Sequence, residues 1–151
     1  MKSLLELGLI AGCIVLLVAC GTSKPQRSDA ANRSLAGSSW RLVQFVGGDD
    51  TNVSPDDPSK YTLTFLSDTE LAVRFDCNRG RATWKSAEPP LIEFGPLAMT
   101  RAMCANPSLH DRLVKQWPYI RSYVMKGDHL FLSLMADGGV YEFEPSAAAP
   151  E

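Results

Sequence analysis

The sequence predicts an α+β domain in which an antiparallel β-sheet, or a partly open barrel of about eight strands, is covered by one α-helix. Three observations lead to this prediction. After residue 35, many segments alternate apolar and polar residues, which is typical of strands that bury one face. After Pro107 the apolar residues change to helical spacing. Strands and helices do not alternate along the chain, which argues against a parallel sheet built from βαβ units.

The strand predictions rest on alternation and on turn residues between the segments. In Tyr61–Leu66, Leu63 and Phe65 alternate with threonines, which predicts one buried face. Ser67 and Asp68 then favour a turn, so this segment and the next should form a hairpin. The expected strands are Ser39–Val46, Tyr61–Leu66, Glu70–Cys77, Arg79–Lys85, Leu91–Phe94, Ser122–Lys126, His129–Met135 and Gly139–Glu144.

One helix is expected after these first five strands. Asn106 is a good N-cap, and Pro107 suits the first helical position because it lacks the N–H that would be unpaired there. Pro118 also lacks an N–H, so the regular helix should end or kink just before it. The apolar stripe should pack against the inner face of the sheet. It consists of Leu109, Leu113, Trp117 and Ile120.

The N-terminal segment predicts export. An apolar run from Leu7 to Cys20 is shorter than the roughly 20 residues that a transmembrane helix needs, and it has the size of a signal-peptide core. The end of the run, Leu17-Val18-Ala19-Cys20-Gly21, resembles the lipobox of bacterial lipoproteins. That resemblance implies that residues 1–19 are removed, that the Cys20 sulfur carries a diacylglyceryl group, and that the new N-terminus is acylated. An ordinary secretory leader is the alternative.

Lipidation at Cys20 would hold the following domain on a membrane, because each buried methylene contributes about 0.8 kcal/mol. Gly21 rather than Asp follows the cysteine, and in enteric-type bacteria this resemblance implies the outer membrane, with the domain facing the periplasm. The small and polar residues of 20–34 predict a flexible tether. Residues 35–145 should form one domain, and residues 146–151 a disordered tail.

Cys77 and Cys104 are the only cysteines beyond the leader and its lipobox. Cys77 ends an expected strand, and Cys104 ends a loop that leads to the expected helix. A disulfide between them would stabilise the domain by roughly 3.5 kcal/mol in the chain-entropy model. Two buried free thiols are the alternative for a reducing compartment, so the export signal favours the disulfide.

A set of motifs extends over the whole expected domain. They are Leu35–Leu42, Leu63–Phe65, Cys77–Arg79, Phe94–Leu97, Thr100–Cys104, Leu113, Tyr123, Gly127, Leu130–Leu132 and Phe143. Together they resemble the META domain of small bacterial envelope lipoproteins and heat-inducible envelope proteins. Three positions depart from its commonest pattern: Asp76 stands where Gly often precedes the cysteine, Ala82 where Gly is usual, and Trp84 where Tyr is common.

The resemblance implies a compact α+β domain without a cofactor. Proteins of this family are associated with stress or antibiotic tolerance and with secretion or motility, without a settled molecular activity.

Four polar residues near the two cysteines are candidates for ligand binding. They are Asn78, Arg79, Arg81 and Arg101. Together they would form a basic patch for an anionic partner such as a lipid head group or a surface polysaccharide. The alternative is structural: Asn78 adopts a turn conformation or bonds to the backbone, and the arginines pair with Asp76, Glu88 or Glu93.

Other classes of function are disfavoured by the sequence. A net charge of −2 lacks the basic excess that nucleic-acid binding requires. The two histidines, His110 and His129, show no arrangement of nucleophile, base and orienting group. They also lack the paired spacing with Cys77 and Cys104 that zinc sites show, and the acidic segment 47–59, expected to be a polar loop, does not match a calcium-binding loop. We therefore expect no metal, no cofactor and no enzymatic activity.

The function predicted is that of a membrane-anchored, non-catalytic envelope lipoprotein. It would support envelope integrity or tolerance of stress and antibiotics by binding an envelope protein or an anionic envelope component. The alternative is an enzyme that acts on an envelope component, which would require a deep pocket lined by converging histidine or carboxylate groups.

Overall fold

The computed structural model describes residues 34–147. The predictions for residues 1–33 and 148–151, including the leader, the lipidation of Cys20 and most of the tether, lie outside this part of the chain. The strands are β1 (Ser39–Val46), β2 (Asn52–Val53), β3 (Tyr61–Phe65), β4 (Glu70–Phe75), β5 (Asn78–Lys85), β6 (Glu93–Phe94), β7 (Ala98–Met99), β8 (Ile120–Lys126), β9 (His129–Leu134) and β10 (Val140–Pro145). The helical elements are η2 (Pro58–Lys60), α1 (His110–Gln116) and η3 (Trp117–Tyr119).

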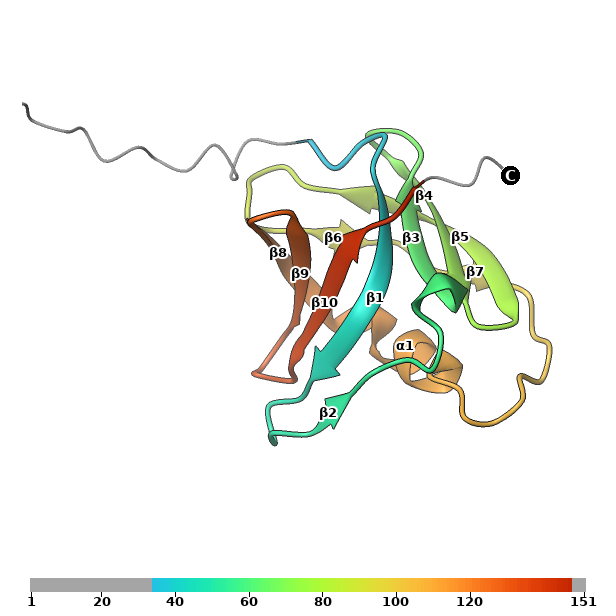
Figure 1. Cartoon of the computed structure of the whole chain (residues 1–151). Coiled ribbons are helices and arrows are strands. Elements are labelled where there is room, and N and C mark those ends of the chain that lie inside the picture. The colour runs from blue at the N-terminus through green and yellow to red at the C-terminus, as the bar shows by residue number, and fades with distance from the viewer. Residues whose placement is uncertain (1–33, 148–151) are drawn as a thin grey trace, which may run out of the picture.

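These strands form one antiparallel sheet that nearly closes into a barrel (Figure 1). The strand order is β6-β5-β4-β3-β1-β10-β9-β8, while β2 pairs with β1 and β7 pairs with β5. The predicted α+β class and barrel are confirmed, and all eight expected strands are present with small shifts at their ends. The sequence analysis missed β2, which lies in the segment expected to be loop, and β7.

The barrel closes where the segment before β6 meets β8. The Ile92 N–H donates to the Arg121 carbonyl oxygen over 3.0 Å, and the Tyr123 N–H donates to the Pro90 carbonyl oxygen over 2.8 Å. Leu91 and Ser122 form the bridge between these bonds. The two end strands of the sheet thus cover part of each other's edge, which limits pairing with other chains.

Apolar side chains fill the interior of the barrel. Leu42, Phe65, Leu71 and Leu130 are completely buried, and they come from both halves of the sheet. The Phe65 ring meets the ring of Trp84 edge-on, with centroids 5.0 Å apart. Close packing of this kind leaves the outer faces of the strands as the place for polar side chains.

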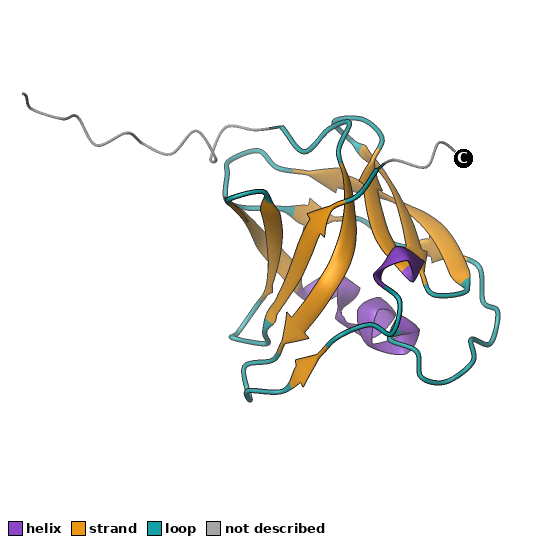
Figure 2. Cartoon of the chain, in the orientation of Figure 1, coloured by secondary structure: helices purple, strands orange, loops and turns teal. Residues whose placement is uncertain are grey.

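Helix α1 and turn η3 cover one end of the barrel (Figure 2). The Trp117 ring lies 4.4 Å from that of Phe94 and 5.9 Å from that of Phe75, and its Nε1–H donates to the Gly95 carbonyl oxygen. Leu113 is 4% exposed. The covering helix is therefore confirmed. Within residues 34–147, no helix is both long enough and apolar enough to cross a membrane.

The predicted start of the helix was wrong. The helix begins at His110, with Leu109 rather than Asn106 in the N-cap position. One tertiary and one local contact explain this: the Leu109 N–H donates to the Tyr61 hydroxyl oxygen over 3.0 Å, and the His110 N–H donates to the nearby Ser108 Oγ over 3.2 Å. These acceptors satisfy N–H groups that an earlier helical turn would have used.

The end of the helix agrees with its prediction. Helix α1 ends at Gln116, and Pro118 lies in the short turn η3 that follows. Ile120, expected in the helical stripe, is instead the first residue of β8 and is buried from there.

Truncation of the helix stripe should measure how much this cover stabilises the barrel. Leu113→Ala is expected to lower the free energy of unfolding by about 2–5 kcal/mol, because it leaves a cavity in a packed core. Lys115→Ala, at an exposed position of the same helix, should change it by no more than about 0.5 kcal/mol. Urea unfolding compares the two. Equal midpoints for wild type and both variants would show that the helix does not cover this core.

Candidate functional site

Strands β4 and β5 are joined by a two-residue turn, Asp76-Cys77, which places Phe75 opposite Asn78. The φ angle of Asp76 is 59°, in the left-handed region. Two hydrogen bonds hold this turn: the Asp76 N–H donates to the Lys60 carbonyl oxygen over 2.7 Å, and Arg74 Nε donates to the Asp76 carbonyl oxygen over 3.0 Å. The register of the hairpin is therefore determined by the turn and its contacts.

The predicted disulfide between Cys77 and Cys104 is confirmed, with Cα atoms 5.5 Å apart. It joins the turn of the hairpin to the loop that leads from β7 toward helix α1. One covalent bond thus connects the sheet to the segment that covers its end.

Asn78 reinforces this connection with its side chain, which is completely buried. Its Oδ1 accepts hydrogen bonds from the Ala102 N–H (2.7 Å) and the Thr100 hydroxyl (2.9 Å), while its Nδ2 donates to the Ala102 carbonyl oxygen (2.9 Å). We call Asn78 and the disulfide the Asn78 clamp. Because both ends of its amide bind the chain, Asn78 has the structural role that was the alternative to ligand binding.

The clamp also aligns β7 against the start of β5. The Arg79 N–H donates to Thr100 Oγ1, and the Thr100 N–H donates to the Arg79 carbonyl oxygen, both over 3.0 Å. At Gly80, a Cβ atom would lie only 2.6 Å from the Ala98 carbonyl oxygen. Glycine is needed there because any side chain would separate the two segments. This contact fixes the position of β5, whose outward residues on either side of Gly80 are Arg79 and Arg81.

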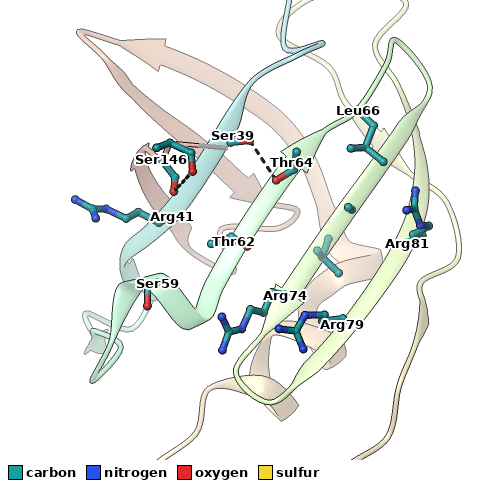
Figure 3. A pocket seen from close by; sticks show the side chains of 13 residues that line it. Ser39, Arg41, Ser59, Thr62, Thr64, Leu66, Arg74, Arg79, Arg81 and Ser146 are labelled. Carbon is teal, nitrogen blue, oxygen red and sulfur yellow. Dashed lines mark hydrogen bonds between the residues drawn. The ribbon is translucent and has the colours of Figure 1, made fainter. Parts of the chain in front are cut away.

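A groove of about 360 Å³ lies on the outer face of β1, β3, β4 and β5 (Figure 3). Among the described residues its lining contains arginines and hydroxyl groups but no carboxylate, and we call it the arginine groove. The arginines are Arg41, Arg74, Arg79 and Arg81. The hydroxyl residues are Ser39, Ser59, Thr62, Thr64 and Ser146.

One row of this groove crosses four strands. Arg41 lies opposite Thr62, Thr62 opposite Arg74, and Arg74 opposite Arg79. Like charges directly opposite each other destabilise an antiparallel pair. The register therefore places two guanidinium-bearing residues, Arg74 and Arg79, next to each other on this face.

The second row of the groove is small and polar. Ser39 lies opposite Thr64, Thr64 opposite Ala72, and Ala72 opposite Arg81. The Ser39 hydroxyl donates to Thr64 Oγ1 over 3.2 Å. The short side chains form a floor between the arginines, so the groove is open to hydrogen bonding along its length.

Some basic side chains in and beside the groove form an ion pair with a carboxylate, whereas Arg74 and Arg81 in the groove do not within the described residues. Lys60 pairs with Asp56 at 3.2 Å, and Arg41 pairs with Glu144 at 2.7 Å. Within residues 34–147, no carboxylate forms an ion pair with Arg74 or Arg81. This end of the groove is positive although the whole chain has a net charge of −2.

The positive field reaches the edge of the groove. Hydrogen bonds from Ser59 are the main cause that holds the pKa of the Asp57 carboxyl below its usual range, and the charges of Lys60 and Arg74 act in the same direction.

The structure divides the predicted binding residues. Arg79 and Arg81 line the groove, Asn78 is buried in the clamp, and Arg101 is exposed outside the groove lining. Sequence reasoning missed Arg41 and Arg74. Both occupy outward positions of predicted strands, but only the strand register brings them to the same face.

A second polar cluster lies on the outer face of β1, β10 and β9. His129 Nδ1 is 2.7 Å from Glu142 Oε1, and Gln44 Nε2 donates to Glu142 Oε2 over 2.6 Å. The Gln44 bond, followed by His129, lowers the pKa of Glu142 from its ordinary value. Within the described residues, no hydroxyl or thiol hydrogen-bonds to His129. The same residues contain no group of three side chains placed to hold a metal.

The barrel and its clamp correspond to a known domain family. The family model of the META domain matches residues 33–148. The chain belongs to the META domain family. A search of curated proteins returned no match.

Two solved structures share the fold of this META domain. An NMR structure of a protein from Burkholderia xenovorans has a TM-score of 0.64 at 21% identity, covering 76% of this chain and 85% of that one. A crystal structure of a DUF4847 family protein from Bacteroides vulgatus has a TM-score of 0.53 at 14% identity, covering 73% and 93%. At these identities the similarity concerns the fold alone.

The geometry explains one departure of this chain from the common META pattern. Asp76 stands where Gly is often found, and its positive φ is a conformation that Gly adopts freely. Asp is among the few other residues that tolerate this region. The turn therefore keeps its shape without glycine.

Loss of the Asn78 side chain should weaken the clamp even with the disulfide intact. Asn78→Ala is expected to lower the free energy of unfolding by about 1–3 kcal/mol, because the Ala102 N–H and carbonyl lose their partners. The control is Asn52→Ala, at an exposed position of β2, with a change within about 0.5 kcal/mol. Urea unfolding without reductant measures both. A wild-type midpoint for Asn78→Ala would contradict the clamp.

Proposed function

We propose that this META domain protein is a lipid-anchored, non-catalytic module of the bacterial envelope that binds an anionic envelope component in the arginine groove. The observation that carries the proposal is the groove itself. Four arginines line it, and of these Arg74 and Arg81 form no ion pair with a carboxylate within residues 34–147, on a chain whose net charge is −2. By holding such a component, the protein would support envelope integrity or tolerance of stress and antibiotics.

The chemistry of the groove supports an anionic ligand. Guanidinium groups stay charged at any physiological pH and offer several N–H donors in a plane, which suits oxyanions. Thr62, Thr64 and Ser39 add hydroxyls that can both donate and accept.

The position of the groove supports attachment near a membrane. The fold begins with buried Leu35, and Ser39, only a few residues later, already lines the groove. If Cys20 carries lipid, the connecting residues 20–34 reach at most on the order of 50 Å when fully extended. The groove would then remain close to the envelope surface that holds the anchor.

The anchor depends on one sulfur atom. Cys20→Ser should abolish incorporation of labelled fatty acid and change membrane fractionation, because serine has no thiol to receive the diacylglyceryl group. Cys13→Ser, within the predicted leader, is the matched control and should label like wild type. Equal labelling of the Cys20→Ser variant and wild type would contradict the lipid anchor.

Capture of the partner should depend on the groove. A photoreactive residue in place of Thr62, in the anchored full-length protein, is expected to give a crosslinked adduct in native membranes. Arg74→Glu with Arg81→Glu should abolish it, and a high-salt wash before irradiation should weaken it because the attraction is electrostatic. Lys115→Glu with Lys126→Glu makes the same charge change at exposed positions outside the groove and should retain the adduct.

An adduct that both double variants form equally would place the partner elsewhere on the domain and contradict this proposal.

A further inference from the structure

We infer that the Cys77–Cys104 disulfide is a site of thiol–disulfide exchange, at which a dithiol attacks the Cys77 sulfur and the Cys104 sulfur leaves as a thiolate. This inference goes beyond the proposed function and does not depend on the arginine groove.

The disulfide lies at the surface of the domain. Cys77 is an exposed residue of the turn between β4 and β5, and Cys104 is partly exposed. Met103, the neighbour of Cys104, is 99% exposed, so the loop that carries this cysteine projects into solvent. Because access limits the rate of exchange, a disulfide in such a place can react with a thiol while the domain stays folded.

Two nitrogen donors are directed at the Cys104 sulfur. The Cys77 backbone N–H donates to Cys104 Sγ over 3.3 Å, and Asn78 Nδ2 donates to the same sulfur over 3.3 Å. The sulfur of a cysteine is a weak acceptor, whereas hydrogen bonds to an ionised acceptor are roughly twice as strong as neutral ones. Both donors therefore stabilise Cys104 more after it has left as a thiolate than before.

The two sulfurs differ in their surroundings. Cys77 Sγ lies farther from Asn78 Nδ2, at 3.5 Å, and its distance to the Ala102 carbonyl oxygen is 3.7 Å, compared with 4.0 Å for Cys104 Sγ. A carbonyl oxygen repels a thiolate but accepts a hydrogen bond from a thiol. Exchange is faster when the better-stabilised thiolate leaves, so attack should occur at Cys77 and release Cys104.

The reaction balances with the dithiol as the reductant. One thiolate of the dithiol attacks Cys77 Sγ and forms a mixed disulfide, and the electron pair of the broken S–S bond moves to Cys104 Sγ. The second thiol of the dithiol then loses its proton and attacks its own first sulfur, which releases Cys77. The dithiol becomes a disulfide by loss of two electrons, and the two cysteines of the domain become thiols.

Exchange would change how the loop after β7 is held. Among the described residues, no backbone–backbone hydrogen bond joins residues 103–108 to the sheet. After reduction, the Asn78 amide still binds Thr100 and Ala102, but no covalent bond extends this attachment to Cys104. The redox state of the dithiol would thus control the mobility of the segment that leads to helix α1.

Glutathione, a monothiol, tests which sulfur is attacked. Full-length protein purified without reductant is mixed with excess glutathione at neutral pH, acid stops the reaction at early times, and peptide mass spectrometry locates the mixed disulfide. Glutathione should be found on Cys77 at least about fivefold more often than on Cys104, which is the effect of one hydrogen bond. Glutathione found equally on both cysteines, or mainly on Cys104, would overturn the assignment of the leaving sulfur.

Dithiothreitol, a small dithiol, tests whether exchange occurs in the folded state. The rate of reduction should rise in proportion to the dithiothreitol concentration and change by less than about twofold in urea well below the unfolding midpoint. Reduction that requires unfolding would instead accelerate about tenfold for each molar of urea, as the unfolded fraction does. That result would overturn exchange in the folded protein.

Asn78→Asp separates stabilisation of the thiolate from a purely structural role of the amide. The carboxylate keeps acceptors for the Thr100 hydroxyl and the Ala102 N–H, but it has no N–H to donate to Cys104. Reduction by dithiothreitol should therefore slow about threefold to tenfold. A structural role alone predicts faster reduction, because the variant is less stable.

Thr100→Val is the matched control, since it removes a hydrogen bond to Asn78 Oδ1 but no donor to sulfur, and it should not slow reduction. Equal or faster reduction of Asn78→Asp relative to wild type would overturn the role of the amide donor. If Asn78→Asp does not fold, the position of glutathione on the wild-type protein still decides which sulfur leaves.

Discussion

The buried amide of Asn78 is the interaction on which most of this structure depends. It is completely buried, and its two polar atoms bind the backbone and hydroxyl groups of the segment from Thr100 to Ala102. An unpaired amide at this depth would cost more than one hydrogen bond contributes, so the segment must stay in place wherever Asn78 is buried. The disulfide beside it reduces the number of conformations open to the unfolded chain. The amide specifies how the segment from Thr100 to Ala102 lies against β5 in the folded state. Upstream this holds the β4–β5 hairpin, and downstream it directs the chain toward the helix that covers the barrel.

The same constraint determines the chemistry of the outer face. A two-residue turn allows only one register between β4 and β5, and that register places Arg74 opposite Arg79. A slip by one residue would move Leu71, Val73 and Phe75 from the core to solvent, which is far more costly than the repulsion of two exposed guanidinium groups. The core thus maintains a like-charge pair that surface electrostatics alone would not favour.

The sequence predicted what depends on local pattern and missed what depends on register. Alternation of Tyr61, Leu63 and Phe65 was enough to find β3, and two cysteines in a domain for which export was expected were enough to predict their disulfide. Strands β2 and β7 have two residues each, too few for a pattern of alternation. The start of the helix depended on the Tyr61 hydroxyl, which is distant in sequence from Leu109. The groove needed Arg41, Arg74 and Arg79 together, and no local pattern indicates that three separate strands bring them to one face.

A filled interior also limits where this fold can act. The barrel encloses aromatic and aliphatic side chains, and helix α1 with Trp117 covers one end. The arginine groove lies instead on outward residues of strands whose inner faces are packed in this core. The half of the barrel that is cross-linked by the Asn78 clamp carries Arg74 and Arg81 in the groove, whereas on the opposite half His129 Nδ1 lies 2.7 Å from Glu142 Oε1. Rigidity and uncompensated charge coincide on β4 and β5, and this coincidence makes that face the part of the domain best suited to hold an anionic ligand.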